Sequence, residues 1–215
     1  MQGKVFRMIC VILAILAFLI VVRYINNQPG QLTAKPVIYL YPPTEQKVSV
    51  KLEFDGKFTF TYPEYNNGWN VIAKPDGTLL NVSDQKEYSY LFWEGIATDQ
   101  TWDLSKGFVV RGEDTKDFLQ VKLSDIGLTP TEYNEFIVYW LPKIQNNKYN
   151  LISFVTDEYA NKAKLKIQPE PDSVLRVFMV VKPLDQYREI ERQEFSPFKR
   201  QGFTVVEWGG TEISD

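Results

Sequence analysis

Three glutamates that stand among aromatic residues are the side chains best suited to chemistry. Glu94 occurs in the sequence FWEG, Glu207 in VEWGG and Glu64 in YPEY. A carboxyl group on an apolar strand face is paired, protonated or directed into a cleft. Burial raises the pKa of such a group toward the range that a general acid needs. These glutamates are therefore the first candidates for a catalytic or ligand-binding role.

Two of the three glutamates lie in alternating, strand-like segments. The residues in phase with them are Tyr88, Tyr90 and Phe92 for Glu94, and Phe203 and Val205 for Glu207. A pair of carboxyl groups about 5–5.5 Å apart suits retaining glycoside hydrolysis, and about 6.5–9.5 Å suits inversion. One hypothesis is therefore a carboxylate-dependent, glycosidase-like hydrolase with Glu94 and Glu207 as its catalytic pair.

The aromatic neighbours of these glutamates suggest a surface that holds a glycan. The side chains expected to contact such a ligand are Glu64, Tyr65, Trp93 and Trp208, with Glu64 also the reserve for the catalytic pair. The structural alternative has more weight. Carboxylates at strand ends commonly pair with arginine, for which Arg111 and Arg176 are available, and tryptophans more often fill a core.

The composition removes most other kinds of catalysis. The 215-residue chain has no histidine, which excludes a Ser-His-Asp triad, a histidine-ligated zinc and an imidazole base. Its one cysteine, Cys10, lies inside an apolar run and is unsuited to thiol chemistry. No phosphate-binding loop, dinucleotide motif or calcium loop is present in the sequence, so no metal or cofactor is predicted.

An N-terminal membrane anchor is the clearest targeting signal. Residues 8–22 are apolar without a break, with Lys4 and Arg7 before them and Arg23 after. The small-x-small cleavage site of a signal peptide does not follow the run, which favours an uncleaved signal-anchor over residues 8–23, with cleavage as the alternative. The positive-inside rule places residues 1–7 in the cytoplasm and the main domain outside, in the cell envelope.

The rest of the chain is acidic. Without Lys4, Arg7 and Arg23, 21 of the 24 basic residues remain against 27 acidic ones, a net charge of −6. Such a domain is a poor nucleic-acid binder, because neutralised phosphates supply most of that affinity. Residues 24–35 contain Pro, Gly and polar residues and predict a tether. They lead to one extracytoplasmic domain over 36–211 and a tail over 212–215.

Period-two patterns predict a sheet-dominated domain. Residues 48–54 and 58–62 alternate around Asp55-Gly56, which predicts a hairpin. A three-residue loop with a bulge would place Leu52 opposite Phe58 and gather the apolar residues on one face. A second turn, KPDG at 74–77, should join strands at 69–74 and 78–82. Further strands are expected at 37–41, 88–94, 108–111, 149–155, 174–181 and 203–208.

Helix signals are confined to the middle of the chain. From Glu113, the apolar residues Leu119, Leu123 and Ile126 recur at helical spacing and Gly127 suits the cap. A capping box with proline begins a second helix at Thr129. Residues 136–142 are ambiguous, and the β-rich IVYW run before Pro142 favours a strand. The prediction is an α+β fold, mostly antiparallel and sandwich-like, with one or two short helices around 113–136 after the transmembrane helix.

Several blocks resemble one family. The blocks KPVIYLYP (35–42), YLFWEG (90–95), FIVYWLP (136–142), RVFM (176–179) and GFTVVEWGG (202–210) resemble a family of uncharacterised bacterial proteins, also found in some eukaryotic microbes. The resemblance covers about residues 35–210 and implies one intact domain. It implies no activity, ligand or catalytic residue.

Two hypotheses of function follow. The first is a membrane-anchored envelope protein, a binding or structural module whose ligand is a glycan, a peptide or another envelope protein. The second is the glycosidase-like hydrolase. The distance and surroundings of the carboxyl groups of Glu94 and Glu207 distinguish them, because two carboxylates that are far apart or salt-bridged in the core cannot share a substrate.

Overall fold

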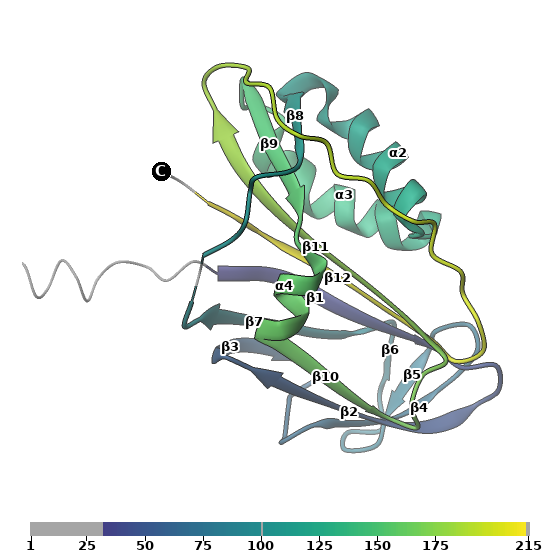
Figure 1. The fold of residues 1–215 in the computed structure, drawn as a ribbon. Helices are drawn as coiled ribbons and strands as arrows, with labels where there is room; N and C mark the ends of the chain where they lie inside the picture. Colours follow the sequence, from purple (N-terminus) through teal and green to yellow (C-terminus); the bar gives the residue numbers. More distant parts are fainter. Residues whose placement is uncertain (1–31, 100, 214–215) are drawn as a thin grey trace, which may run out of the picture. The chain divides into compact units, whose positions relative to one another are not determined.

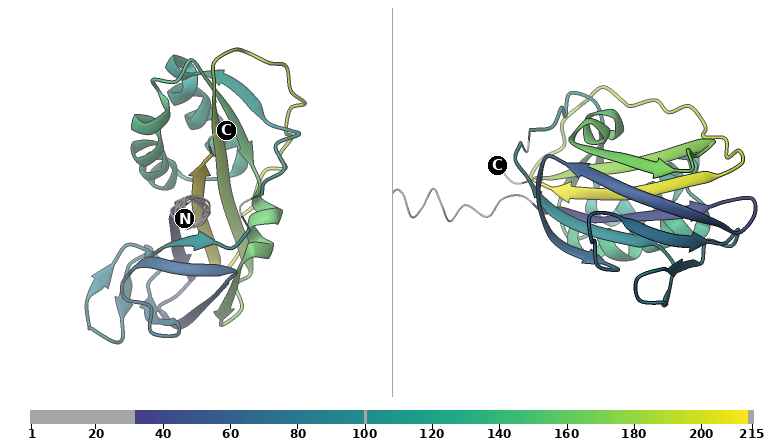
Figure 2. Two further views of the ribbon diagram at one scale, coloured as in Figure 1. Left: turned by 90° about the vertical axis from the view of Figure 1, so that its left-hand side faces the viewer. Right: turned by 90° about the horizontal axis from the view of Figure 1, so that it is seen from below.

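A computed structural model describes residues 32–99 and 101–213, which belong to one compact unit. Two sheets and a pair of helices form three layers (Figures 1 and 2). The larger sheet has seven strands in the order β3-β7-β1-β12-β11-β9-β8, and the smaller has five in the order β10-β2-β4-β5-β6. All strand pairs are antiparallel except β11 with β12. The predicted β-rich α+β class is confirmed.

The elements have the following bounds. The strands of the larger sheet are β3 (Gly56–Tyr62), β7 (Leu91–Ala97), β1 (Leu32–Tyr41), β12 (Thr204–Glu212), β11 (Ser173–Leu184), β9 (Tyr149–Phe154) and β8 (Phe108–Arg111). Those of the smaller sheet are β10 (Ala163–Gln168), β2 (Gln46–Phe54), β4 (Trp69–Ala73), β5 (Leu79–Asn81) and β6 (Glu87–Tyr88). The helices are η1 (Gly112–Asp114), α2 (Thr115–Ile126), α3 (Pro130–Ile144) and α4 (Thr156–Lys162). Strand β1 begins within the segment predicted as a tether.

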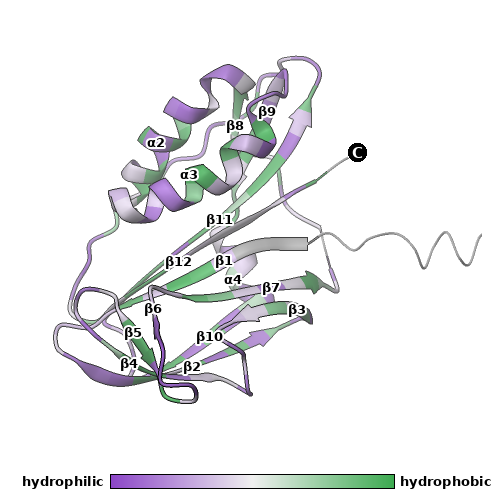
Figure 3. Cartoon of the chain, turned by 180° about the vertical axis from the view of Figure 1, so that it is seen from behind, coloured by the Kyte–Doolittle hydropathy of each residue, from purple (hydrophilic) through white to green (hydrophobic). Residues whose placement is uncertain are grey.

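Each face of the larger sheet covers its own core. One core lies between the two sheets and includes Ile38, Trp93, Phe178 and Val205. The other lies against α2 and α3 and includes Trp140 and Trp208, among others. Helices α2 and α3 carry both hydrophobic and hydrophilic residues along their length (Figure 3). This pattern fits helices with one buried and one exposed face.

The predicted hairpin over 48–62 is wrong, although its strands exist. β2 pairs with β4 and β10 in the smaller sheet, whereas β3 pairs with β7 in the larger. The chain therefore changes sheets at Asp55-Gly56 instead of folding back on itself. Phe54 and Phe58 still pack together, with ring centroids 5.7 Å apart, from opposite sides of the core between the sheets. The alternating pattern identified the buried face but not the partner strand.

A close backbone approach at Gly56 explains why the chain can change sheets there. An added Cβ atom at Gly56 would lie 2.2 Å from the carbonyl oxygen of Ile96 and 2.6 Å from the ring of Phe54. Both backbone groups of the neighbouring Asp55 form hydrogen bonds. Its N–H donates to the Lys162 oxygen at 2.9 Å, and its carbonyl oxygen accepts from the N–H of Thr98 at 2.9 Å. These contacts fix the crossing between the layers.

The second predicted turn is confirmed. Lys74 N–H donates to the Thr78 oxygen at 2.9 Å, Gly77 has a φ of +90°, and β4 pairs with β5 across the turn.

The first predicted helix is confirmed too, with Leu119, Leu123 and Ile126 buried and Gly127 at its C-cap with a φ of +122°.

The predicted strand over 136–142 is wrong, because these residues belong to α3, which extends to Ile144. The capping box at Thr129 is present as expected, and Phe136, Trp140 and Ile144 are buried along one side of the helix. Pro142 removes one hydrogen bond, at a cost of about 3 kcal/mol. Burying three large side chains contributes roughly 1.5–3 kcal/mol each, which outweighs that cost.

The predicted membrane anchor at residues 8–23 lies outside the described residues. Within 32–99 and 101–213, no helix combines the length and the apolar character needed to cross a membrane.

The change of sheets at Gly56 provides a stability test. We expect Gly56→Ala to lower the free energy of unfolding by about 1–3 kcal/mol, because the new methyl group overlaps a backbone oxygen that cannot move freely. The exposed neighbour provides the control, since Lys57→Ala adds nothing to this contact. Urea unfolding of both variants measures the difference. Equal stability of the two variants would show that Gly56 is not a tight crossing point.

Candidate functional site

Glu207 is fully buried and forms the centre of a polar cluster between the sheets. Its Oε2 atom accepts a hydrogen bond from Arg176 Nε at 2.6 Å, across the parallel pair β11 and β12. Its Oε1 atom accepts from the Tyr159 hydroxyl at 2.9 Å and from Trp93 Nε1 at 3.2 Å. Of the two arginines expected as partners for the strand carboxylates, Arg176 pairs with Glu207, whereas Arg111 pairs with Glu113. Both carboxylate oxygens are occupied by protein donors.

Arg176 stacks as well as pairs. Its guanidinium carbon lies 4.6 Å from the centroid of the Tyr159 ring. Burial lowers the pKa of Arg176, but the charges of Glu207 and Tyr159 and the hydrogen bonds to them together outweigh burial and raise that pKa, so the guanidinium group stays charged. Burial also raises the pKa of Tyr159 well above its usual value, which keeps the hydroxyl protonated as a donor.

Glu94 lies on the opposite face of the larger sheet. Its neighbour Trp93 points into the core between the sheets, so Glu94, one residue on, points toward the helix side. The charge of Lys143 on α3 acts on it there. Glu94 and Glu207 are thus separated by the sheet and share no cavity. The arrangement required for a pair of catalytic carboxylates around one glycosidic bond is not formed.

The side chains predicted to contact a ligand are mostly used inside the protein. Trp93 and Trp208 are fully buried, on opposite faces of the sheet. The Tyr65 hydroxyl bonds the backbone of Leu52, accepting from its N–H at 3.0 Å. Glu64 is exposed in the loop after β3. The structure does not bring these four together into one surface.

A different set of aromatic residues is exposed around Glu94. Strand β3 pairs Phe60 with Glu94 and Tyr62 with Phe92, so all four side chains point to the same side of the sheet. A register shift between Phe58 and Phe60 turns Phe60 away from the core that Phe58 lines. Phe60 is 55% exposed and Tyr62 54%. We call this set, together with Tyr88 and Tyr90, the aromatic face.

Ring contacts hold the aromatic face together. Phe60 and Phe92 have centroids 5.7 Å apart, and Tyr62 and Tyr88 meet edge to face at 5.0 Å. Tyr90 meets Tyr39 edge to face at 5.6 Å. A shallow hollow of about 400 Å³ lies where Tyr62, Tyr88 and Tyr90 meet residues of the smaller sheet.

Helix α3 borders the aromatic face on one side. Helices α2 and α3 cover only part of the larger sheet, and β3 and β7 extend beyond them (Figure 3). On the flank of α3, Glu135 accepts a hydrogen bond from the Tyr39 hydroxyl at 2.9 Å. Lys143 lies 4.6 Å over the ring of Tyr139. Carboxylates, an ammonium group and phenol groups therefore border the exposed rings.

Partial burial changes the ionisation of this border. Desolvation raises the pKa of the Glu94 carboxyl, and the charge of Lys143 offsets only part of that effect. Burial, followed by the charge of Glu94, raises the pKa of Tyr139, so its hydroxyl remains a donor. No group of three or more acidic or thiol side chains able to hold a metal occurs in the described part of the chain.

Comparison with family models, curated proteins and solved structures finds no match. The geometry of the site alone therefore carries the functional argument.

The sequence indicated part of this site and missed the rest. The phase of Glu94 with Phe92 was predicted correctly, and the two lie on one face with Tyr90 nearby. The alternation of Phe60 and Tyr62 with polar residues predicts that they share one apolar face with Phe58. The signal against that assignment is weak: only the register shift at Thr59 reverses their side, and β3 is an edge strand.

The two glutamates should differ sharply in their effect on stability. Glu207→Gln leaves the buried Arg176 without its carboxylate and should cost about 3–5 kcal/mol in the free energy of unfolding. Glu94→Gln is the matched control at a half-buried position without such a partner and should not destabilise the protein. Urea unfolding at pH 7 measures both. A Glu207→Gln variant as stable as Glu94→Gln would contradict the structural role of Glu207.

Glu94 should also make stability depend on pH. Its pKa is raised in the folded protein, so the folded state holds this proton more tightly than the unfolded state. The charged form therefore costs stability, with the cost absent below the unfolded pKa and complete above the folded one. The difference in unfolding free energy between Glu94→Gln and wild type should grow in favour of the variant from pH 3 to pH 7. A difference independent of pH would refute the raised pKa.

Proposed function

We propose that residues 36–211 form a carbohydrate-binding module, held on the outer side of a membrane by the anchor at residues 8–23. The observation that supports it is the aromatic face: Phe60 and Tyr62 are neighbouring exposed rings on an edge strand, with Glu94 beside them. Contiguous exposed aromatic side chains are uncommon on soluble domains and mark binding surfaces. A sugar ring packs its C–H groups on such rings.

The polar border favours a sugar over a lipid or a nucleic acid. Glu94, Glu135 and the tyrosine hydroxyls are hydrogen-bonding groups at the edge of the rings, where the hydroxyl groups of a bound sugar would lie. The domain is acidic, which disfavours both anionic lipid and phosphate backbones. The opening is shallow, about 400 Å³ beside Tyr62, and suits an extended chain more than an enclosed small molecule.

Binding without hydrolysis is the function proposed. Glu207, the predicted partner of Glu94 in catalysis, is buried on the other face of the sheet with both oxygens accepting hydrogen bonds. Glu94 remains at the aromatic face as a hydrogen-bonding group. The proposed location outside the cell would bring the module to envelope polysaccharides, which are suitable ligands for such a surface.

The proposal predicts a loss of glycan binding without a loss of stability. Phe60→Ala and Tyr62→Ala should each weaken binding to insoluble peptidoglycan or another envelope polysaccharide about tenfold, as loss of one aromatic stacking contact implies. Tyr187→Ala removes an equally exposed tyrosine elsewhere, at 62% exposure, and should leave binding unchanged. Co-sedimentation of the purified full-length protein with each polysaccharide measures the effect. Absence of binding to all of them, or an equal effect of Tyr187→Ala, would refute the proposal.

A further inference from the structure

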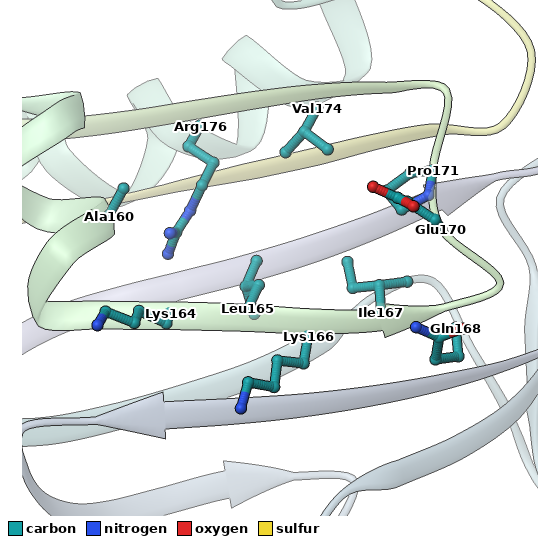
Figure 4. Close-up of a pocket in the computed structure, with 10 residues that line it drawn as sticks. All are labelled: Ala160, Lys164, Leu165, Lys166, Ile167, Gln168, Glu170, Pro171, Val174 and Arg176. Carbon is teal, nitrogen blue, oxygen red and sulfur yellow. The ribbon is translucent and has the colours of Figure 1, made fainter.

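A second surface, remote from the aromatic face, lies where the two sheets diverge. A groove of about 580 Å³ runs between β10, the edge of the smaller sheet, and the first half of β11 (Figure 4). Ala160 of α4 lines one end, and the connection from Gln168 to Pro171 lines the other. The groove lies beside the buried cluster of Glu207, because Arg176 takes part in both.

Both strands that flank the groove lack a neighbour on that side. Among the described strands, β10 is the terminal strand of its sheet and pairs only with β2. β9 pairs with β11 from Met179 to Leu184 only, so in the described chain no strand pairs with residues 173–175 on the groove side. Backbone groups of two strand edges therefore border one groove, which is the arrangement that accepts an added extended segment.

Arg176 carries a donor that the protein itself does not use. Its side chain is only 10% exposed, and Nε is occupied by Glu207. Nη2 is buried and has no hydrogen-bond partner among the residues that the structure describes. Figure 4 shows the guanidinium group directed from β11 into the space above β10. An unsatisfied, charged donor at such a depth is costly, and an anionic group that enters the groove would satisfy it.

The charges along the groove are not evenly distributed. Lys164 and Arg176 lie toward the α4 end, whereas Glu170 lies at the far end near Pro171 (Figure 4). Lys166 lies between them and pairs with Glu53 of β2. Lys164 provides the positive charge at the α4 end, because the charge of Arg176 is already paired with Glu207. The layout favours a ligand with a carboxylate at the α4 end and a cation at the other.

We propose that this groove binds an extended segment of a partner polypeptide, with an acidic side chain near Arg176 and a basic one near Glu170. The segment adds as a strand beside β10, and its carboxylate accepts a hydrogen bond from Nη2. β10 has six residues, so at about 3.3 Å per residue the groove accommodates roughly six residues of extended chain. This interaction is independent of the proposed glycan binding, because the aromatic face lies on the helix side of the larger sheet.

A designed peptide tests the proposal. The probe is the capped, fluorescein-labelled hexapeptide VEVTVK, compared with VQVTVK, which lacks only the acidic side chain, and each is titrated with full-length protein in detergent micelles. We expect saturable binding of VEVTVK by fluorescence anisotropy and at least about tenfold weaker binding of VQVTVK, because a charge-assisted hydrogen bond is lost. Equal affinity of the two peptides, or no binding of either, would overturn the proposal.

Matched variants locate the binding. Val174→Glu places a negative charge in the groove at a 44% exposed position and should abolish binding of VEVTVK. Val138→Glu introduces the same change at an exposed position of α3 and should leave the affinity unchanged. If both variants weakened binding equally, the effect would come from the overall charge of the protein, and the groove would be refuted as the binding site. If millimolar sodium acetate displaced VEVTVK completely, the groove would be a simple anion site and the proposed binding of an extended peptide would be refuted.

Discussion

The buried ion pair between Arg176 and Glu207 is the constraint on which the rest of the structure depends. A carboxylate with no exposure to water is stable only when its charge is paired and its oxygens are hydrogen-bonded. Glu207 lies on β12, and three other elements supply its partners: β11 holds Arg176, α4 holds Tyr159 and β7 holds Trp93. The cluster therefore fixes the register of the parallel strands and docks α4 against the larger sheet.

The same cluster determines which side of the molecule is open. Tyr159 stacks on Phe178 with centroids 4.1 Å apart, so α4 lies close to β11 at the point where β9 ends. From there the chain enters β10, which joins the other sheet. Helix α4 occupies the place that a continuation of β9 along β11 would take. Beyond α4, β10 and β11 therefore separate. The groove, and beside it the unsatisfied donor of Arg176, are consequences of that geometry.

The parts of the fold that depend on neighbouring residues were predictable, and those that depend on distant pairing were not. The capping box at Thr129 and the turn at 74–77 are local and formed as expected. The hairpin at Asp55-Gly56 failed because a sheet crossing and a hairpin share turn residues and alternation. Residues 136–142 failed because burial of Trp140 against the sheet outweighs a local preference for strand.

The site shows the same division. The phase of Glu94 follows from alternation within one strand, and Arg176 is one of the two arginines that the sequence offers as partners for the strand carboxylates. The aromatic face could not be predicted, because a single register shift at Thr59 decides whether Phe60 faces the core or solvent. The chain has no histidine that could titrate near neutral pH. At this surface, burial raises the pKa of the Glu94 carboxyl group. Since it lies beside the exposed rings, a sugar that covers them would desolvate it further and raise that pKa again, so glycan binding should take up protons.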